Sequence, residues 1–251
     1  MDPRGERILV TGGAGFIGST LIRRIIDHNQ VVILDTFGRD ALQYHPGLAE
    51  HPHLTVMRGS VLDPEAVERA MDGATMVVHC AAVAGIDSVG VHPTRTMRIN
   101  VEGAANLFAA VLPAMLERHQ GQLVGVSSIA RWRGLPRSGS YSASKAALTT
   151  LMESMRLELR AEGIAVTAVH PGFVVTPMTE KNAFRMPFLM DVDKAARVTT
   201  RGILERRRDV NYPRAMVLAV QLSRLMPNWL YDRLMGGKAG WTLKPEGKRP
   251  R

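Results

Sequence analysis

Short apolar runs alternate with stretches of helical periodicity along most of the chain. Apolar runs bounded by Gly, Asp, Ser or Pro are typical of buried strands. Such runs occur at residues 7–10, 31–35, 54–58, 75–80, 122–127, 165–170 and 210–213. Stretches of helical length separate most of them. Strands and helices in alternation predict an α/β fold around a parallel sheet.

Helices are predicted at residues 16–27, 64–71, 93–119, 142–160 and from 191 onward. Asp63 before Pro64 predicts an N-cap followed by a first-turn proline. Pro113 predicts a bend in the long third helix. The fourth helix carries an apolar stripe expected to pack in the core or on another subunit, formed by Ala147, Leu151, Met155 and Leu159.

The remaining segments have less regular patterns. Residues 38–53 are predicted to be irregular, and 177–190 form an apolar segment that we expect to close over a substrate as a lid. Two apolar helices at 215–226 and 227–235 pack on the domain, join subunits or rest on a membrane surface. The first is too short to span a bilayer.

Length and spacing predict one domain over residues 1–251. We expect a single Rossmann-like, doubly wound parallel sheet in a three-layer αβα arrangement. Residues of about 6–112 form a cofactor-binding half and about 113–212 a catalytic half. Residues 213–251 add the apolar helices and a basic tail.

Composition narrows the class of protein. Cys80 is the one cysteine, so no internal disulfide forms, which is consistent with a cytoplasmic setting. The first residues have no apolar core, and no apolar run reaches eighteen residues, so neither a signal peptide nor a membrane span is expected. The formal charge of +9 comes from dispersed arginines and a basic tail. Without interleaved aromatic residues this charge predicts no nucleic-acid partner.

A glycine-rich loop directly follows the first predicted strand. Gly12 permits a tight turn, Gly15 lets the backbone approach a pyrophosphate, and Gly18 allows close packing of helix on strand. The helix after it offers its first amides to phosphates. This context predicts a dinucleotide site whose loop residues are Gly12, Ala14, Gly15, Phe16, Ile17 and Gly18.

Asp35 ends the second strand, 17 residues after Gly18. A carboxylate there accepts hydrogen bonds from both ribose hydroxyls and repels a 2′-phosphate, so NAD is favoured over NADP. Arg39 lies nearby and softens that preference, and the alternative is that Asp35 only stabilises a turn. Small residues after the fourth strand let the cofactor lie against the strand end: Cys80, Ala81 and Ala82. We interpret Cys80 as a small apolar residue and not as a nucleophile.

Candidate catalytic residues cluster in the middle of the chain. Tyr141 and Lys145 are four apart, so on a helix they share one face. A lysine cation favours the phenolate, lowers the phenol pKa and makes the pair a proton shuttle. Ser128 follows the fifth strand and is placed to hold a substrate oxygen beside the phenol. His45, His51 and His53 lack acidic or cysteine partners at a metal-binding spacing, so no metal site is predicted.

These motifs together resemble the short-chain dehydrogenase/reductase family over residues 6–212. The glycine loop, Ser128 with Tyr-x-x-x-Lys, and the His170-Pro-Gly segment carry the resemblance. It implies that Asn100 completes the active site by ordering a water linked to Lys145, which also binds ribose. It implies an adenine contact at Ser60 or the Val61 backbone, where relatives usually have an acid. It also implies backbone contacts to the nicotinamide carboxamide at Pro171, Gly172, Val174 and Thr176.

The two halves resemble different branches of that family. The segments TGGAGFIG and MRINVEGAANL are similar to the extended branch, which includes sugar-nucleotide epimerases. From about residue 113 onward the chain is similar to the single-domain branch. The mosaic suggests a natural hybrid or an engineered chimera with a seam near 108–116.

The preferred function is hydride transfer between NAD and a lipophilic secondary alcohol or ketone, in a homodimer or homotetramer. Two alternatives stay open. One is a sugar-nucleotide epimerase or dehydratase, which needs a second nucleotide pocket for which the chain has little room after Tyr212. The other is a cofactor-binding scaffold or designed chimera without turnover. Membrane contact is expected only through the C-terminal apolar helices.

Overall fold

The computed structural model describes residues 5–176, 179 and 186–236. Within these residues, seven parallel strands form one sheet in the order β3-β2-β1-β4-β5-β6-β7. They are β1 (Arg7–Thr11), β2 (Gln30–Asp35), β3 (Leu54–Arg58), β4 (Met76–His79), β5 (Gly121–Val126), β6 (Ile164–Pro171) and β7 (Asp209–Tyr212). The strand order reverses between β1 and β4, as in a doubly wound fold. The predicted Rossmann-like α/β class is therefore confirmed.

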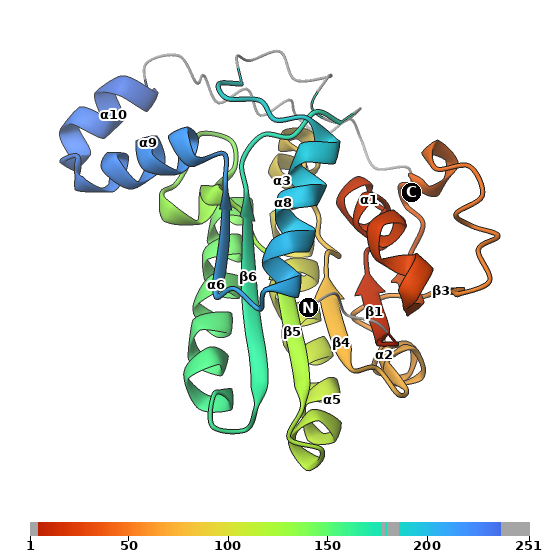
Figure 1. Ribbon diagram of the computed structural model, residues 1–251. Coiled ribbons are helices and arrows are strands. Elements are labelled where there is room, and N and C mark those ends of the chain that lie inside the picture. The colour runs from red at the N-terminus through yellow and green to blue at the C-terminus, as the bar shows by residue number, and fades with distance from the viewer. Residues whose placement is uncertain (1–4, 177–178, 180–185, 237–251) are drawn as a thin grey trace, which may run out of the picture.

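Helices cover both faces of the sheet. α1 (Phe16–Ile25) and α8 (Val192–Leu204) lie on one face, in front of the sheet in Figure 1. The opposite face is covered by α2 (Pro64–Met71), α5 (Gly103–Glu117) and α6 (Gly139–Leu159). The predicted N-cap of α2 is present, since the Asp63 carboxylate accepts from the amides of Glu65 and Ala66.

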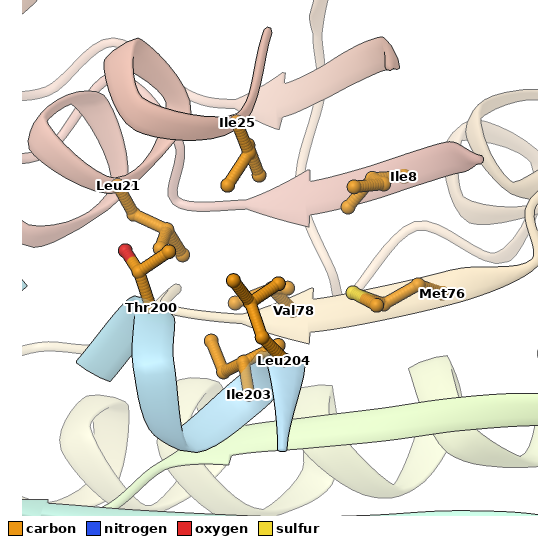
Figure 2. A pocket seen from close by; sticks show the side chains of 8 residues that line it. All are labelled: Ile8, Leu21, Ile25, Met76, Val78, Thr200, Ile203 and Leu204. Atoms are coloured by element: carbon orange, nitrogen blue, oxygen red, sulfur yellow. The ribbon is translucent and has the colours of Figure 1, made fainter. Parts of the chain in front are cut away.

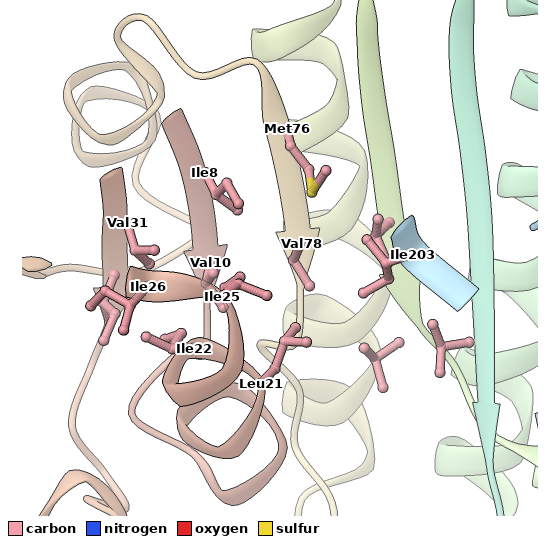
Figure 3. Packing of buried hydrophobic residues seen from close by; sticks show 14 of the residues in the cluster. Ile8, Val10, Leu21, Ile22, Ile25, Ile26, Val31, Met76, Val78 and Ile203 are labelled. Atoms are coloured by element: carbon pink, nitrogen blue, oxygen red, sulfur yellow. The ribbon is translucent and has the colours of Figure 1, made fainter. Parts of the chain in front are cut away.

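The core on the α1 and α8 face is built from alternate strand positions. Ile8 and Val10 of β1 point to this face with Val78 of β4. They pack against Leu21 of α1 and Ile203 of α8, as Figure 3 shows. All five side chains are buried. Because successive strand residues face opposite sides, both faces of β1 must be apolar.

The second core lies on the opposite face. Leu9 of β1 and Leu123 of β5 are fully buried there, with Leu107, Phe108 and Val111 of α5. The stretch Pro93–Glu117 is long and apolar enough to cross a membrane by length and composition. Its burial against the sheet identifies it as a core helix.

The predicted long third helix contains a change of helical type. It comprises α4 (Pro93–Met97), a π-helical segment η3 (Arg98–Glu102) and α5. The α-helical pattern is interrupted around Asn100, whereas Pro113 lies inside α5. A π segment widens the helix by one residue per turn and often marks a functional position.

The buried face of α6 is wider than the predicted apolar stripe. Its buried apolar residues are Leu148, Met152, Met155 and Leu159. Leu151 is partly buried and packs on the same core, so the stripe is confirmed for Leu151, Met155 and Leu159, whereas Leu148 and Met152 were missed. Lys145 belongs to the buried face, and a buried lysine conceals the true stripe from an apolar pattern.

Shorter elements complete the described chain. The predicted irregular loop contains η2 (Leu42–Tyr44) and the first helix continues into η1 (Ile26–His28). η4 (Ile129–Trp132) follows β5, and α3 (Ile86–Val91) precedes α4. After β7 come α9 (Arg214–Leu225) and α10 (Asn228–Gly236), close to their predicted bounds.

A small cavity lies between the sheet and α8. Figure 2 shows its lining, which includes Ile8 and Met76 from the strands and Thr200 and Ile203 from α8. Its volume is about 10 Å³, which is about the smallest that can hold one water molecule. The Thr200 hydroxyl is buried with no hydrogen-bond partner among the described residues. The neighbouring Thr199 hydroxyl instead bonds the Tyr212 phenol at 2.8 Å.

We therefore expect the same substitution at these two adjacent threonines to change the free energy of unfolding in opposite directions. Thr200→Val removes an unpartnered hydroxyl from an apolar cavity, so we expect the free energy of unfolding to rise by about 1 kcal/mol. Thr199→Val leaves the Tyr212 phenol unpaired and should lower it by about 1–3 kcal/mol. Urea denaturation of both variants checks this. A destabilised Thr200→Val protein would show that the hydroxyl has a bonding role.

Candidate active site

The predicted site residues converge on the carboxyl edge of the sheet. The glycine loop follows β1, Asp35 ends β2, and Cys80 follows β4. Ser128 follows β5, and Pro171 ends β6. Ligands bind at this edge of an open parallel sheet, at the point where strand order reverses.

Two positions of the glycine loop have no room for a side chain. Gly12 has φ +69°, and a Cβ there would lie 2.5 Å from the Ala81 nitrogen. A Cβ on Gly18 would lie 2.7 Å from the Gly12 carbonyl oxygen. Gly15 is the N-cap of α1 and supplies no side-chain cap to its first amides. Ala14, Phe16 and Ile17 complete the turn, so this loop fits a pyrophosphate at the helix N-terminus.

Asp35 has the local structural role that the alternative interpretation predicted, and its contact with a ribose stays a prediction. Its carboxylate accepts from the Ala14 amide at 3.0 Å and from the Phe37 amide at 2.8 Å. Burial raises its pKa, and the amide bonds from Phe37, Ala14 and Thr36 offset part of that rise. The carboxylate thus braces the glycine loop, and its remaining lone pairs are those that would meet a ribose.

The predicted adenine contact and the small residues after β4 differ in their surroundings. The Ser60 hydroxyl accepts from the Leu62 amide at 3.1 Å, which makes it a turn residue. Val61 is buried and packs on Gly103. A Cβ added to Gly103 would lie 2.4 Å from Val61 Cγ2. Burial raises the pKa of the Cys80 thiol to about 12, in keeping with a small apolar role. Ala81 and Ala82 follow it beside the glycine loop.

Ser128 and Tyr141 form the polar centre of the catalytic half. Ser128 Oγ accepts from the Ala130 amide at 3.1 Å and lies 3.4 Å from the Pro171 carbonyl oxygen. The nearby Ser128 side chain favours the ionised phenol of Tyr141 and so lowers its pKa, against the effect of burial on that group. Burial dominates and raises the Tyr141 pKa. The prediction that Lys145 lowers the Tyr141 pKa was therefore wrong.

Lys145 lies one turn after Tyr141, on the buried face of α6. Its Nζ donates to the Val126 carbonyl at 2.8 Å and lies 5.7 Å from the Tyr141 ring centroid. Burial lowers the Lys145 pKa to about 8. The ammonium thus ties the helix to the end of β5 and stands beside the phenol.

Asn100 acts as a clamp between two elements. Its Oδ1 accepts from the Val83 amide at 2.6 Å. Its Nδ2 donates to the Val83 carbonyl at 3.1 Å and to Ser144 Oγ at 3.0 Å. These bonds join the loop after β4 to the residue before Lys145. The implied water-ordering role stays a prediction.

The His-Pro-Gly segment is held by neighbouring strands and loops. The Gly172 amide donates to the Tyr212 carbonyl at 2.7 Å. Val174 is buried and pairs with Met190, and the Thr176 amide donates to Thr179 Oγ1 at 2.8 Å. The Thr176 amide therefore already has a partner within the protein.

The predicted lid lies partly outside the described residues, including Met178 and Phe184. In its described part, Phe188 and Leu189 are exposed, whereas Met190 packs on the core.

Sequence reasoning missed several buried polar residues around the site. Thr11 Oγ1 lies 2.8 Å from His79 Nδ1 across β1 and β4, and burial with the nearby Lys145 charge lowers the His79 pKa to about 3. Ser127 and Thr149 hydroxyls both donate to the Lys145 carbonyl at 2.9 Å. A polar residue at the end of an apolar strand is the sequence signal that could have identified such residues, and His79 at the end of β4 is an example.

Comparison with known proteins gives consistent matches. The family model described as short chain dehydrogenase matches residues 6–185. An uncharacterized oxidoreductase of Myxococcus xanthus (strain DK1622) is 41% identical over 182 residues, which cover 71% of this chain and 70% of that protein. A 3-alpha-(or 20-beta)-hydroxysteroid dehydrogenase of Mycobacterium bovis is 29% identical over 186 residues, covering 70% and 72% respectively.

The fold likeness extends further along the chain. The crystal structure of a short chain dehydrogenase from Burkholderia cenocepacia J2315 in complex with NADP superposes with a TM-score of 0.76. It covers 94% of this chain and 99% of its own, at 22% identity, so the likeness is one of fold.

The buried lysine predicts a pH dependence of stability. Between pH 8 and 10.5 the unfolded chain keeps the Lys145 proton while the folded protein loses it, so Lys145 adds stability as the pH rises through this window. At 1.36 kcal/mol per pKa unit, this contribution is about 3 kcal/mol. The raised Cys80 pKa acts in the opposite direction above pH 9 in every variant, so the Lys145 contribution is the difference between the curves. Lys145→Met should lack this contribution, whereas a variant of the exposed Lys194, Lys194→Met, should keep it. Denaturation curves across the window test this, and parallel curves for all three proteins would contradict it.

Proposed function

The chain belongs to the short-chain dehydrogenase family, and on that premise we propose that it transfers a hydride between a nicotinamide cofactor and a secondary alcohol or ketone. The observation that carries the proposal is the nearness of the Ser128 side chain to the Tyr141 phenol, whose pKa it lowers, with Lys145 Nζ 5.7 Å from the same ring on the next helical turn. A general acid, an oxygen ligand and a fixed cation then surround one position. These three groups are sufficient to bind a carbonyl oxygen and to protonate it.

The cofactor supplies the hydride when bound. The glycine loop and the free first amides of α1 fit its pyrophosphate, and Asp35 fits its adenosine ribose. We propose NAD as the preferred cofactor, because the Asp35 carboxylate would repel a 2′-phosphate. Arg39 lies on the same loop and would moderate this preference.

The protein's own groups would handle the proton. Ser128 would hold the substrate oxygen and Tyr141 would give it the proton. Because burial raises the Tyr141 pKa, the phenol keeps its proton at neutral pH and suits ketone reduction. The Lys145 ammonium would then stabilise the phenolate that remains. Asn100 would hold Lys145 in place through Ser144.

We propose a lipophilic ketone as substrate. Apolar side chains near the site support this, since Phe188 and Leu189 are exposed and Trp132 stands on η4 after Ser128. The hydroxysteroid dehydrogenase relative is consistent with such a class. The alternatives of a sugar-nucleotide epimerase, and of a scaffold without turnover, predict different outcomes in the test below.

The remaining proposals concern the setting of the enzyme. We propose a cytoplasmic homodimer or homotetramer, in which the lone Cys80 stays a thiol. The two-branch mosaic with a seam near 108–116 stays a hypothesis, and this seam falls within α5.

Cofactor choice provides one test. Asp35→Ala removes a ribose partner and a repulsive charge, so the NADP-to-NAD affinity ratio should rise by about tenfold or more. The ratio is the readout, because the variant also loses one bond to the glycine loop, at the Ala14 amide, and one to the Phe37 amide. Asp40→Ala, which removes a nearby loop acid, should leave the ratio almost unchanged. Tighter binding of NADP than NAD by the unmodified protein would overturn the preference.

The catalytic assignment is tested with a panel of ketones and NADH. Larger apolar ketones should be reduced faster than small polar ones. Tyr141→Phe should lower turnover by about a hundredfold or more with NADH affinity nearly unchanged. Tyr44→Phe, which removes an exposed phenol, should match the unmodified protein.

Three outcomes would contradict this assignment. Near-normal turnover of Tyr141→Phe would exclude the phenol as the acid. Isomerised UDP-sugar with tightly retained NAD and no net redox change would favour the epimerase. Bound cofactor with no activity across the panel would favour the scaffold.

A further inference from the structure

The two C-terminal helices form an arm that has no buried residues. In α9 and α10 no side chain reaches the burial of the core, although both helices are rich in apolar residues. Figure 1 shows them at the upper left, beyond the edge of the sheet. We call residues 214–236 the arm.

One face of the arm is apolar and directed to solvent. On α9, Ala215, Leu218, Leu222 and Leu225 recur at spacings of three and four, which places them on one helical stripe. Leu218 is 58% exposed, Leu222 56% and Leu225 82%. On α10, Trp229 is 69% exposed and Leu234 63%. The less exposed positions of α9, Met216, Val217 and Val220, form the other side of the helix.

The arm is attached to the domain by specific polar contacts. Arg133, in the loop after η4, donates to the Met226 carbonyl at 2.9 Å and to Asn228 Oδ1 at 2.9 Å. Its guanidinium lies 3.8 Å from the Tyr231 ring centroid, and the Tyr231 hydroxyl donates to the Gly134 carbonyl at 2.6 Å. The junction of α9 and α10 is therefore held in place, and the apolar stripe is presented outward.

Positive charge is concentrated in the same part of the chain. Residues 213–251 contain eight Lys or Arg and two Asp or Glu, so they carry six of the nine net positive charges. The arm contributes Arg214, Arg224 and Arg233, and the fifteen residues after it contribute the other five basic residues. An exposed apolar helix face beside basic residues suits the boundary between lipid headgroups and acyl chains.

We propose that the arm docks on the surface of an anionic lipid bilayer. The leucine stripe of α9 and Trp229 enter the headgroup boundary, and the basic residues contact lipid phosphates. The arm meets the domain at the carboxyl edge of the sheet, where Arg133 follows Ser128 and Gly172 packs against Pro213. Docking therefore turns the candidate site toward the lipid. The proposal concerns membrane binding alone, so it does not depend on which reaction the protein catalyses.

A second copy of the chain is the competing occupant of this surface. A two-fold interface brings the same patch of both subunits together. The two arms, each with three arginines and one aspartate, would then face one another, and like charges repel. Charge thus favours an anionic surface over self-association.

Sedimentation with lipid vesicles tests the proposal. The protein should bind vesicles of mixed phosphatidylcholine and phosphatidylglycerol, bind phosphatidylcholine alone more weakly, and be released by salt. Leu222→Gln combined with Leu225→Gln should weaken binding at least about tenfold, because apolar burial is lost. Leu157→Gln, at a residue 77% exposed on α6, should bind like the unmodified protein. Circular dichroism verifies the fold of each variant.

A charge variant keeps the test informative if the double leucine variant does not fold. Arg214→Gln with Arg224→Gln should weaken binding to the anionic vesicles and leave binding to phosphatidylcholine unchanged. Absence of vesicle binding by the unmodified protein overturns the proposal, and so does unchanged binding by both arm variants. An oligomer that dissociates in the leucine variant, as measured by light scattering, without vesicle binding, assigns the surface to a second copy.

Discussion

The buried ammonium of Lys145 is the constraint on which the catalytic half depends. It donates to the Val126 carbonyl at 2.8 Å and so joins α6 to the end of β5. Ser127 and Thr149 hold the carbonyl of the same residue, and Ser144 next to it receives the Asn100 amide. Burying the cation is unfavourable, as its lowered pKa shows. The polar contacts around it offset that cost and place Tyr141 and Ser128 side by side.

The cofactor half depends on close packing of backbone. Gly12 approaches Ala81 so closely that no side chain fits, which brings the loop after β1 against the end of β4. Asp35 then braces this loop through the Ala14 amide. The same carboxylate therefore shapes the loop and, in the proposed function, would also meet the ribose. Cofactor choice and loop geometry would then be coupled at Asp35.

The arm and the site share one connecting segment. The chain passes from Ser128 through η4 to Arg133, which holds the junction of α9 and α10. Helices without buried residues gain little stability from packing on their own domain. This arrangement is understandable if a further surface covers the apolar stripe. A bilayer in that place would lie next to the edge of the sheet at which the proposed apolar substrate would bind.

The sequence alone determined the strands, the parallel fold and the residues of the glycine loop and the Ser128, Tyr141 and Lys145 set, because these follow from local periodicity and fixed spacing. It missed Leu148 and Met152 on the buried face of α6 and predicted the wrong direction for the Tyr141 pKa. Both errors have one cause: burial is set by neighbours distant in sequence, and burial decided which face of α6 is inside and how the phenol titrates. The second role of Asp35 and the clamp at Asn100 likewise depend on contacts between separate loops, which only the tertiary structure brings together.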